Sequence, residues 1–259
     1  MNRASSVTES PYTYAIGYIH GRADLLRELL FAIERRARWE QFQYRVVFLG
    51  NLIDLGPASS EVVDLALAIT RQHPGSALIL GRHEAQVLRI LDEKDWKKRQ
   101  SMVVPWFTTM GGEETLMSYG TTQRTDLVDA IGEVVDPRHI EFFRKAKHYV
   151  ELDHHVIVHA SLKPGVHLID QDYEWLLRPQ REFLDHRESF GKKVIHGQPF
   201  GDRTGVENHP NRIAINDANY ALGALSAVCV EPTGEVHSIR AIRSGKGITV
   251  EGLPLPVFE

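Results

Sequence analysis

The sequence predicts an α/β fold in which two packed, mixed β-sheets are flanked by helices. In the first third, short apolar segments typical of strands alternate with amphipathic segments typical of helices. Each of the first three predicted strands is followed by a loop that begins with glycine, at Gly17, Gly50 and Gly81. The second half returns to closely spaced strands, and no linker separates the two halves, which favours one domain over residues 12–259.

The first part of the chain reads as three strand–helix units. Leu25, Leu29 and Ile33 recur at helical spacing in the first helix, and Ser59 or Ser60 is the expected N-cap of the second. Strands separated by helices form parallel pairs with right-handed crossovers. The elements expected here are, in order, Tyr12–Ile16, Arg22–Arg36, Arg45–Leu49, Ser59–Arg71, Ala77–Leu80 and His83–Leu91.

The rest of the chain divides into a helical segment and a strand-rich segment. Residues 92–147 are expected to be mainly helical and to form a cap or flanking segment, whereas the polar residues 1–11 are expected to be a disordered tail. The strands expected after the helical segment are Val150–Leu152, Val156–His159, Lys193–His196, Arg212–Asn216, Ala221–Val230 and Val236–Arg240.

Composition excludes several classes of function. A net charge of −4 gives no bulk positive surface, so we expect no nucleic-acid partner. No apolar run approaches the ~20 residues that span a bilayer, so we expect no membrane partner. The single cysteine, Cys229, lies in an apolar run and is expected in the core, which fits a reducing, cytoplasmic location.

Polar residues cluster directly after the predicted strands, where α/β sheets usually build their sites. A lone histidine at a strand end is more often structural than a ligand, but five such segments occur in one chain. They read Gly17-Tyr18-Ile19-His20-Gly21, Gly50-Asn51-Leu52-Ile53-Asp54-Leu55-Gly56-Pro57, Gly81-Arg82-His83-Glu84, Val158-His159-Ala160-Ser161 and His196-Gly197-Gln198-Pro199.

In order, spacing and flanking residues these segments resemble the calcineurin-like metallophosphoesterases, in the bacterial Ser/Thr phosphoprotein phosphatase-like and diadenosine tetraphosphatase-like branch. That family reads Gly-Asp-x-His-Gly, Gly-Asp-x-x-Asp-Arg-Gly-Pro, Gly-Asn-His-Glu, Val-His-Ala-Gly and Gly-His-Thr. The resemblance runs from about Tyr12 to Glu231 and includes Gly111-Gly112-Glu113-Glu114-Thr115-Leu116 and Asn211-Arg212-Ile213. It implies the two-sheet sandwich, with the site at the strand ends.

The resemblance also implies two divalent ions, which share a bridging carboxylate and lie about 3.5–4 Å apart. Four of the matching ligand positions are replaced here, and they carry Tyr18, Asn51, Arg82 and Gln198. Asn51 replaces the bridging aspartate, and Arg82 puts a fixed cation with no lone pair where the family has asparagine. The residual metal positions are therefore His20, Asn51 and His159, and we predict that no dinuclear centre forms.

The residues that assist catalysis in the family survive in part. His83 matches the general acid, and Asp54 matches the carboxylate that orients it. The two phosphate-binding arginines of the family correspond to Leu55 and Gln180, although Arg178 or Arg181 lies close enough in sequence to substitute for the second.

The preferred hypothesis is a pseudophosphatase that binds a phosphate-containing ligand without metal. Arg82 would reach into the space that the metal ions take in the family and form an anion pocket with His20, His83 and His159. The ligand would be phosphate, a nucleotide or a phosphoprotein. In the alternative without a ligand, Arg82 pairs with Asp54 or Glu84.

Two other functions stay open on the sequence. One is a weakly active phosphoesterase in which His20, Asn51, His159 and either Gln198 or His196 hold one Mn, Fe or Zn ion. The other is a scaffold or homo-oligomer subunit that acts through its surface, to which the basic and aromatic residues 92–110 would contribute.

Overall fold

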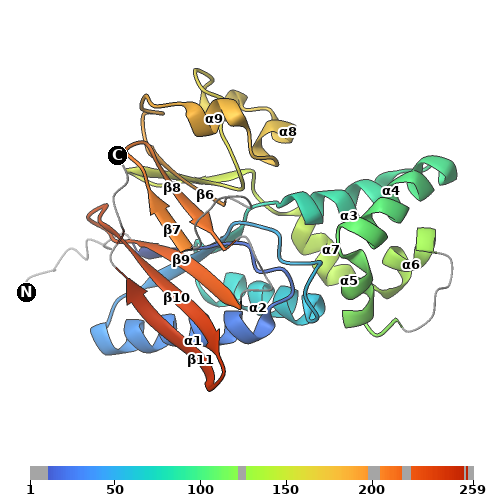
Figure 1. Cartoon of the computed structure of the whole chain (residues 1–259), viewed down its shortest axis with the longest axis horizontal. Coiled ribbons are helices and arrows are strands. Elements are labelled where there is room, and N and C mark those ends of the chain that lie inside the picture. Colours follow the sequence, from blue (N-terminus) through green and yellow to red (C-terminus); the bar gives the residue numbers. More distant parts are fainter. Residues whose placement is uncertain (1–10, 122–126, 198–204, 218–222, 254, 256–259) are drawn as a thin grey trace, which may run out of the picture.

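The computed structural model describes residues 11–121, 127–197, 205–217, 223–253 and 255. The expected tail lies almost entirely outside this range, and so do Gln198 and residues 221–222. Within it, the predicted two-sheet α/β architecture is confirmed (Figure 1). The described residues contain no helix that is long and apolar enough to cross a bilayer.

The first sheet has six strands in the order β11-β10-β9-β1-β2-β3. Its parallel half consists of β1 (Tyr12–Ile16), β2 (Tyr44–Phe48) and β3 (Ala77–Leu78), linked by α1 (Ala23–Glu40) and α2 (Ser59–Gln72). Its antiparallel half consists of β9 (Ala224–Val230), β10 (Val236–Ser244) and β11 (Gly247–Leu253). The sequence did not predict β11, which extends the sheet at its antiparallel edge.

The second sheet has five strands in the order β4-β5-β6-β8-β7 and is also mixed. The strands β5 (His155–Val158), β6 (Lys193–Gly197) and β8 (Arg212–Asn216) run parallel, and their carboxyl ends lie at one edge. Two antiparallel strands flank them, β4 (Tyr149–Glu151) and β7 (Gly205–Asn208), the second of which was not predicted.

The core has three parts because each sheet buries two faces. Ala15, Val47, Ile157, Ile195 and Ile213 come from both sheets and pack together between them. The outer face of the first sheet packs on α1 and α2, and the outer face of the second sheet contributes Val156, Val158 and Val194 to a smaller cluster. Because successive side chains along a strand point to opposite faces, each strand contributes to both faces of its sheet. Both faces are apolar because both are covered.

Besides α1 and α2, the helices around this sandwich form two groups (Figure 1). One group follows β3 and gathers at one side of the sheets, whereas the other lies beside β6 and β8. The first group consists of α3 (Arg82–Asp92), α4 (Trp96–Thr109), α5 (Gly112–Ser118), α6 (Leu127–Val134) and α7 (Pro137–Arg144). The second consists of the 3-10 helix η1 (Leu168–Asp170), α8 (Tyr173–Leu176) and α9 (Arg181–Asp185).

The predicted N-cap of α2 is wrong. The structure places Ala58 at that position, and Ser59 is the first helical residue. The Ser59 hydroxyl does not cap the helix; it lies 3.1 Å from the backbone nitrogen of Asp54, whose N–H donates to it. A serine in this position therefore supports the preceding loop.

Candidate functional site

The candidate site is built from loops that leave the carboxyl ends of β1, β2, β3 and β5. The β1 and β2 loops are tied together, because the backbone amides of Ile19 and His20 both donate to the Asn51 carbonyl, at 3.1 and 2.9 Å. His20, Asn51, Asp54 and Leu55 have φ angles of +46°, +52°, +69° and +67°. Such left-handed backbone is strained for residues other than glycine and is typical of functional sites.

A buried carboxylate, Glu84 of α3, holds the β2 loop in place. It accepts hydrogen bonds from the backbone amides of Asn51 at 2.9 Å, Leu52 at 2.6 Å and Ile53 at 3.3 Å. Gly81 permits this approach, since a Cβ there would lie 2.2 Å from the Asn51 nitrogen. Burial raises the pKa of Glu84 to about 7. The sequence analysis did not assign Glu84 this role.

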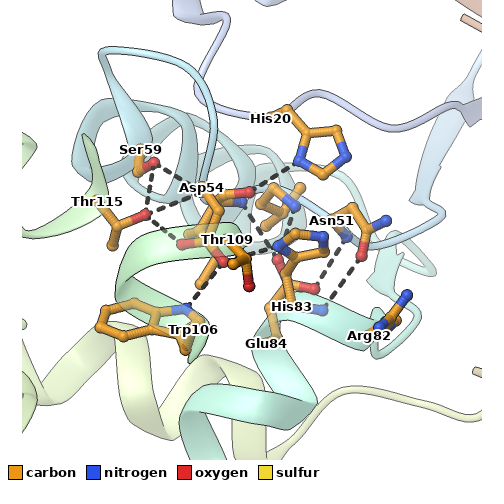
Figure 2. A network of polar contacts seen from close by, with 12 residues as sticks. His20, Asn51, Asp54, Ser59, Arg82, His83, Glu84, Trp106, Thr109 and Thr115 are labelled. Carbon is orange, nitrogen blue, oxygen red and sulfur yellow. Dashed lines mark hydrogen bonds and ion pairs between the residues drawn. The ribbon is translucent and has the colours of Figure 1, made fainter. Parts of the chain in front are cut away.

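Asp54 and His83 form a hydrogen-bonded pair at the centre of the site (Figure 2). The Oδ2 atom of Asp54 lies 2.7 Å from His83 Nδ1 and also accepts from Trp106 Nε1 at 2.9 Å. The Thr115 hydroxyl donates to Oδ1 at 2.6 Å. Burial raises the pKa of Asp54 to about 7, and burial together with the Arg82 charge lowers that of His83 to about 4. The imidazole of His83 is therefore neutral at pH 7.

Trp106 and Thr115 are site residues that the sequence analysis missed. They come from α4 and α5, which lie in the helical segment after α3, more than 50 residues from Asp54 in the chain. The only sequence signal was that Thr115 falls in the Gly-Gly-Glu-Glu-Thr-Leu stretch shared with the phosphatases.

His20 faces His83, with ring centroids 4.8 Å apart in an edge-to-face arrangement. Its Nδ1 lies 3.0 Å from the Ile53 carbonyl oxygen. Because a carbonyl only accepts, Nδ1 carries the proton and Nε2 keeps its lone pair. Burial lowers the pKa of His20 to about 3, so the ring is neutral. His20 thus retains one nitrogen with the electronic character of a ligand.

The two nitrogens of His159 are both engaged within the protein. Nδ1 donates to the Leu49 carbonyl, so Nε2 is the acceptor, and it receives the backbone amide of Arg82 at 3.2 Å. Burial lowers the pKa of His159 to about 3. A metal ion at this imidazole would have to displace the first amide of α3.

Tyr18 packs against His159 where the family has a metal-binding aspartate. Its hydroxyl donates to the His159 carbonyl at 2.9 Å, and the two rings lie 4.8 Å apart at an interplanar angle of 33°. On another side it contacts Gly197, where a Cβ would lie 2.3 Å from Tyr18 Cε1. Burial raises the pKa of Tyr18, which keeps the phenol neutral. Tyr18 therefore fills this part of the site with an uncharged ring.

Asn51 is buried, and its Oδ1 accepts the backbone amide of His83 at 3.3 Å. Leu55 packs beside Gly111 and donates its backbone N–H to the Gly111 carbonyl at 3.2 Å.

Gln180 is half-buried at the N-cap of α9. Gln198, the fourth replaced metal position, lies outside the described residues. His196 packs edge-to-face on Phe183 on the outer face of the second sheet.

Arg82 is exposed at the first position of α3 and points away from the Asp54 network (Figure 2). It makes no side-chain ion pair or hydrogen bond to any described residue, Asp54 and Glu84 included. Burial, and after it the charges of Arg178 and Arg89, lower the pKa of Arg82, so both arginines lie close enough to act on its charge. Arg89 is paired with Glu174, whereas Arg178 has no carboxylate partner in the described part of the chain.

Of the two arginines suggested as substitutes near Gln180, the structure brings only one to the site. Arg178 lies close enough to Arg82 to affect its pKa. Arg181 is exposed and pairs at 3.2 Å with Asp185, four residues later in the same helix. The cationic part of the site therefore consists of Arg82 and Arg178.

The residues present do not fit a dinuclear metal centre. The described part of the chain contains no group of three or more His, Cys, Asp and Glu side chains placed to hold an ion. Glu84 is bound to backbone amides, Asp54 to His83, Trp106 and Thr115, and the Nε2 of His159 to an amide. Among the described residues at the site, His20 and His83 each keep one imidazole nitrogen, Nε2, that no hydrogen bond engages, and imidazole nitrogen is a ligand that transition metals prefer.

Comparison with known proteins establishes the fold. No family model matches the chain, and no curated protein sequence matches it. A solved structure described as a candidate diadenosine tetraphosphatase is similar with a TM-score of 0.56 and 19% identity, covering 89% of this chain and 94% of that one. A metallophosphoesterase from Sphaerobacter thermophilus is similar with a TM-score of 0.52 and 12% identity, and the similarity covers 95% of this chain and 89% of that one.

A third solved structure, a cold-active protein-tyrosine phosphatase of a psychrophilic Shewanella species, has a TM-score of 0.51 and 16% identity to this chain. The similarity covers 94% of this chain and 80% of the phosphatase chain. The chain thus has the calcineurin-like metallophosphoesterase fold, as the motifs predicted.

Proposed function

We propose that this chain, built on the metallophosphoesterase fold, is a catalytically degenerate pseudophosphatase that binds a phosphate-containing ligand through Arg82. One observation carries the proposal. Arg178 lies close enough to Arg82 for its charge to lower the pKa of Arg82, and neither residue has a carboxylate partner among the described residues. The carboxylates of the site are already engaged, Asp54 with His83 and Glu84 with backbone amides.

Charge balance supports an anionic ligand at this place. Two neighbouring guanidinium groups repel each other, and an oxyanion between them removes that repulsion and accepts their N–H donors. His20, His83 and His159 are neutral at pH 7, so they add no positive charge. Free phosphate, a nucleotide and a phosphoprotein all present the required group.

The proposal is tested by titrating the full chain with inorganic phosphate and measuring heat. We expect Arg82→Gln to lower the affinity about tenfold or more, since one charge-assisted hydrogen bond contributes ~1.5–3 kcal/mol. Arg35→Gln is the matched control, because Arg35 is also exposed and carries the same charge. Equal affinities in wild type and Arg82→Gln would refute the role of Arg82.

A weakly active, mononuclear phosphoesterase is the second candidate. The observation that favours it is the Asp54–His83 pair, in which the carboxylate lies 2.7 Å from the imidazole and orients it, next to the free nitrogen of His20. Metal analysis of protein purified without chelators, followed by a phosphatase assay with manganese, separates the two functions. A tightly bound ion with turnover that His83→Gln abolishes would replace the pseudophosphatase proposal.

A further inference from the structure

A second concentration of positive charge lies at the opposite end of the sandwich. β5, β6 and β8 run parallel, so their amino ends share the edge far from Arg82. A cavity of about 530 Å³ opens there, between the start of β6 and the segments around 153–154, 187–191 and 210–211. Arg187, Lys193, His154 and Asn211 line it.

Arg212, the next residue after Asn211 of the cavity wall, is a buried cation that forms no ion pair with a described carboxylate. The residue is 5% exposed and forms no ion pair with any described residue. Its Nε has no hydrogen-bond partner, and its Nη1 reaches only the Asn211 side-chain oxygen, at 3.4 Å. Charged side chains are rarely buried unpaired, because transfer out of water is costly unless an opposite charge compensates it.

Two carboxylates lie near Arg212 without forming an ion pair with it. Glu207 lies 3.2 Å from His209 Nε2, and Asp185 lies 3.2 Å from Arg181 Nε. Both are close enough to raise the pKa of Arg212, but burial and the charge of Arg187 outweigh them, and the net effect lowers it. Arg212 thus forms no ion pair with a described residue, although both carboxylates act on its charge from a longer distance.

The cavity wall itself has an excess of cations. Arg187 and Lys193 form no ion pair with a described residue, and burial lowers the pKa of Lys193. Lys192 is neutralised by Glu151 at 2.9 Å. The lining also contains one carboxylate, Asp153; burial lowers the pKa of Arg45 of β2, and the charge of Asp153 opposes that shift. Three cations, namely Arg187, Lys193 and Arg212, form no ion pair with a described residue at one corner of a chain whose net charge is −4.

We propose that this cavity is a second oxyanion site that takes a phosphate-type dianion. Arg187 and Lys193 supply the direct N–H donors, and Arg212 adds positive potential from behind Asn211. A dianion compensates the cationic corner better than a carboxylate does. The site is separate from Arg82, so it does not depend on the proposed function.

The test uses inorganic phosphate and the full chain, with the number of bound anions as the readout. If both sites bind, the wild type takes up two phosphates. Arg82→Gln keeps only the phosphate in the cavity, and Arg187→Gln/Lys193→Met keeps only the phosphate at Arg82. Removing both direct donors is expected to weaken the second site at least tenfold. Arg35→Gln/Lys246→Met removes two exposed charges elsewhere and is expected to keep both sites.

Two further measurements keep the outcome decisive. Arg187 is exposed, so Arg187→Gln alone is expected to fold and to show the weakening if the double variant does not fold. In a phosphate-soaked crystal, density is expected beside Arg187 and Lys193. Acetate is expected to bind at least tenfold more weakly than phosphate. Unchanged stoichiometry in the Arg187 and Lys193 variants, or equal affinity for acetate, overturns the inference; loss of binding at Arg82 alone does not affect it.

Discussion

Glu84 shows how a single buried carboxylate organises the site. Its two oxygens accept three consecutive backbone amides, which fixes the left-handed loop that presents Asn51 and Asp54. Buried amides without an acceptor are costly, so the loop depends on this side chain. In this chain the acidic residue of the third motif is thus a structural support for the loop that carries Asn51 and Asp54.

We expect Glu84→Gln to lower the free energy of unfolding by about 1–3 kcal/mol. The glutamine NH₂ cannot accept the Asn51 amide, which now receives the Glu84 oxygen at 2.9 Å. Urea unfolding at pH 8 measures the change, because there Glu84, with a pKa near 7, is ionised in wild type. Glu113→Gln, at an exposed position, is the control and is expected to change stability by less than about 0.5 kcal/mol.

At the scale of elements, strand ends and helix starts bring the site together. β6 ends at Gly197, against which the Tyr18 ring of the β1 loop packs, and α3 begins with Arg82 and His83. The helices α4 and α5 add Trp106 and Thr115 from the side. The contact between Gly197 and Tyr18 joins the two sheets at the site.

Gly197→Ala is expected to destabilise the protein by about 1–3 kcal/mol, because its Cβ would lie 2.3–2.7 Å from Tyr18 ring and hydroxyl atoms. In a Tyr18→Ala background the same change is expected to cost far less, since the clash is gone. Thermal unfolding of wild type, both single variants and the double variant gives the coupling energy. A coupling near zero would mean that Tyr18 does not pack on Gly197.

For the whole molecule, burial of histidines in the strands of the second sheet predicts sensitivity to acid. His155 is the first residue of β5 and His196 lies on the outer face of β6, and burial lowers their pKa values to about 4 and about 3. Unfolding returns each to about 6.5, so the unfolded chain binds more protons between these values. Their contribution is present above pH 6.5 and is lost as the pH falls toward 4. Asp54 and Glu84, with pKa values raised to about 7, act in the opposite direction.

His196→Gln isolates one such contribution. The free energy of unfolding of the variant, relative to that of wild type, is expected to rise by about 1.4 kcal/mol for each pH unit below 6.5, down to about pH 4. Denaturant unfolding of both proteins between pH 4 and 8 measures this difference. A difference independent of pH would mean that His196 titrates normally in the folded protein.

The sequence by itself determined the elements and the chemistry at their ends. Alternation and helical spacing located β1, β2, α1 and α2, and the motifs located the replaced positions at Tyr18, Asn51 and Arg82. These signals are local, since each depends on residues within one turn or one strand. Two edge-forming strands, β7 and β11, were missed because short or Gly-containing segments carry little periodic signal.

Only the tertiary structure decided which polar groups are already engaged. Several contacts at the site join residues that are 52 to 96 positions apart in the chain. His159 accepts the Arg82 amide, Trp106 and Thr115 donate to Asp54, and Arg178 rather than Arg181 lies near Arg82. Hydrogen bonds and ion pairs are short-ranged in space but not in sequence, so spacing alone does not specify them. Folding therefore settled which side chains remain free to bind a ligand.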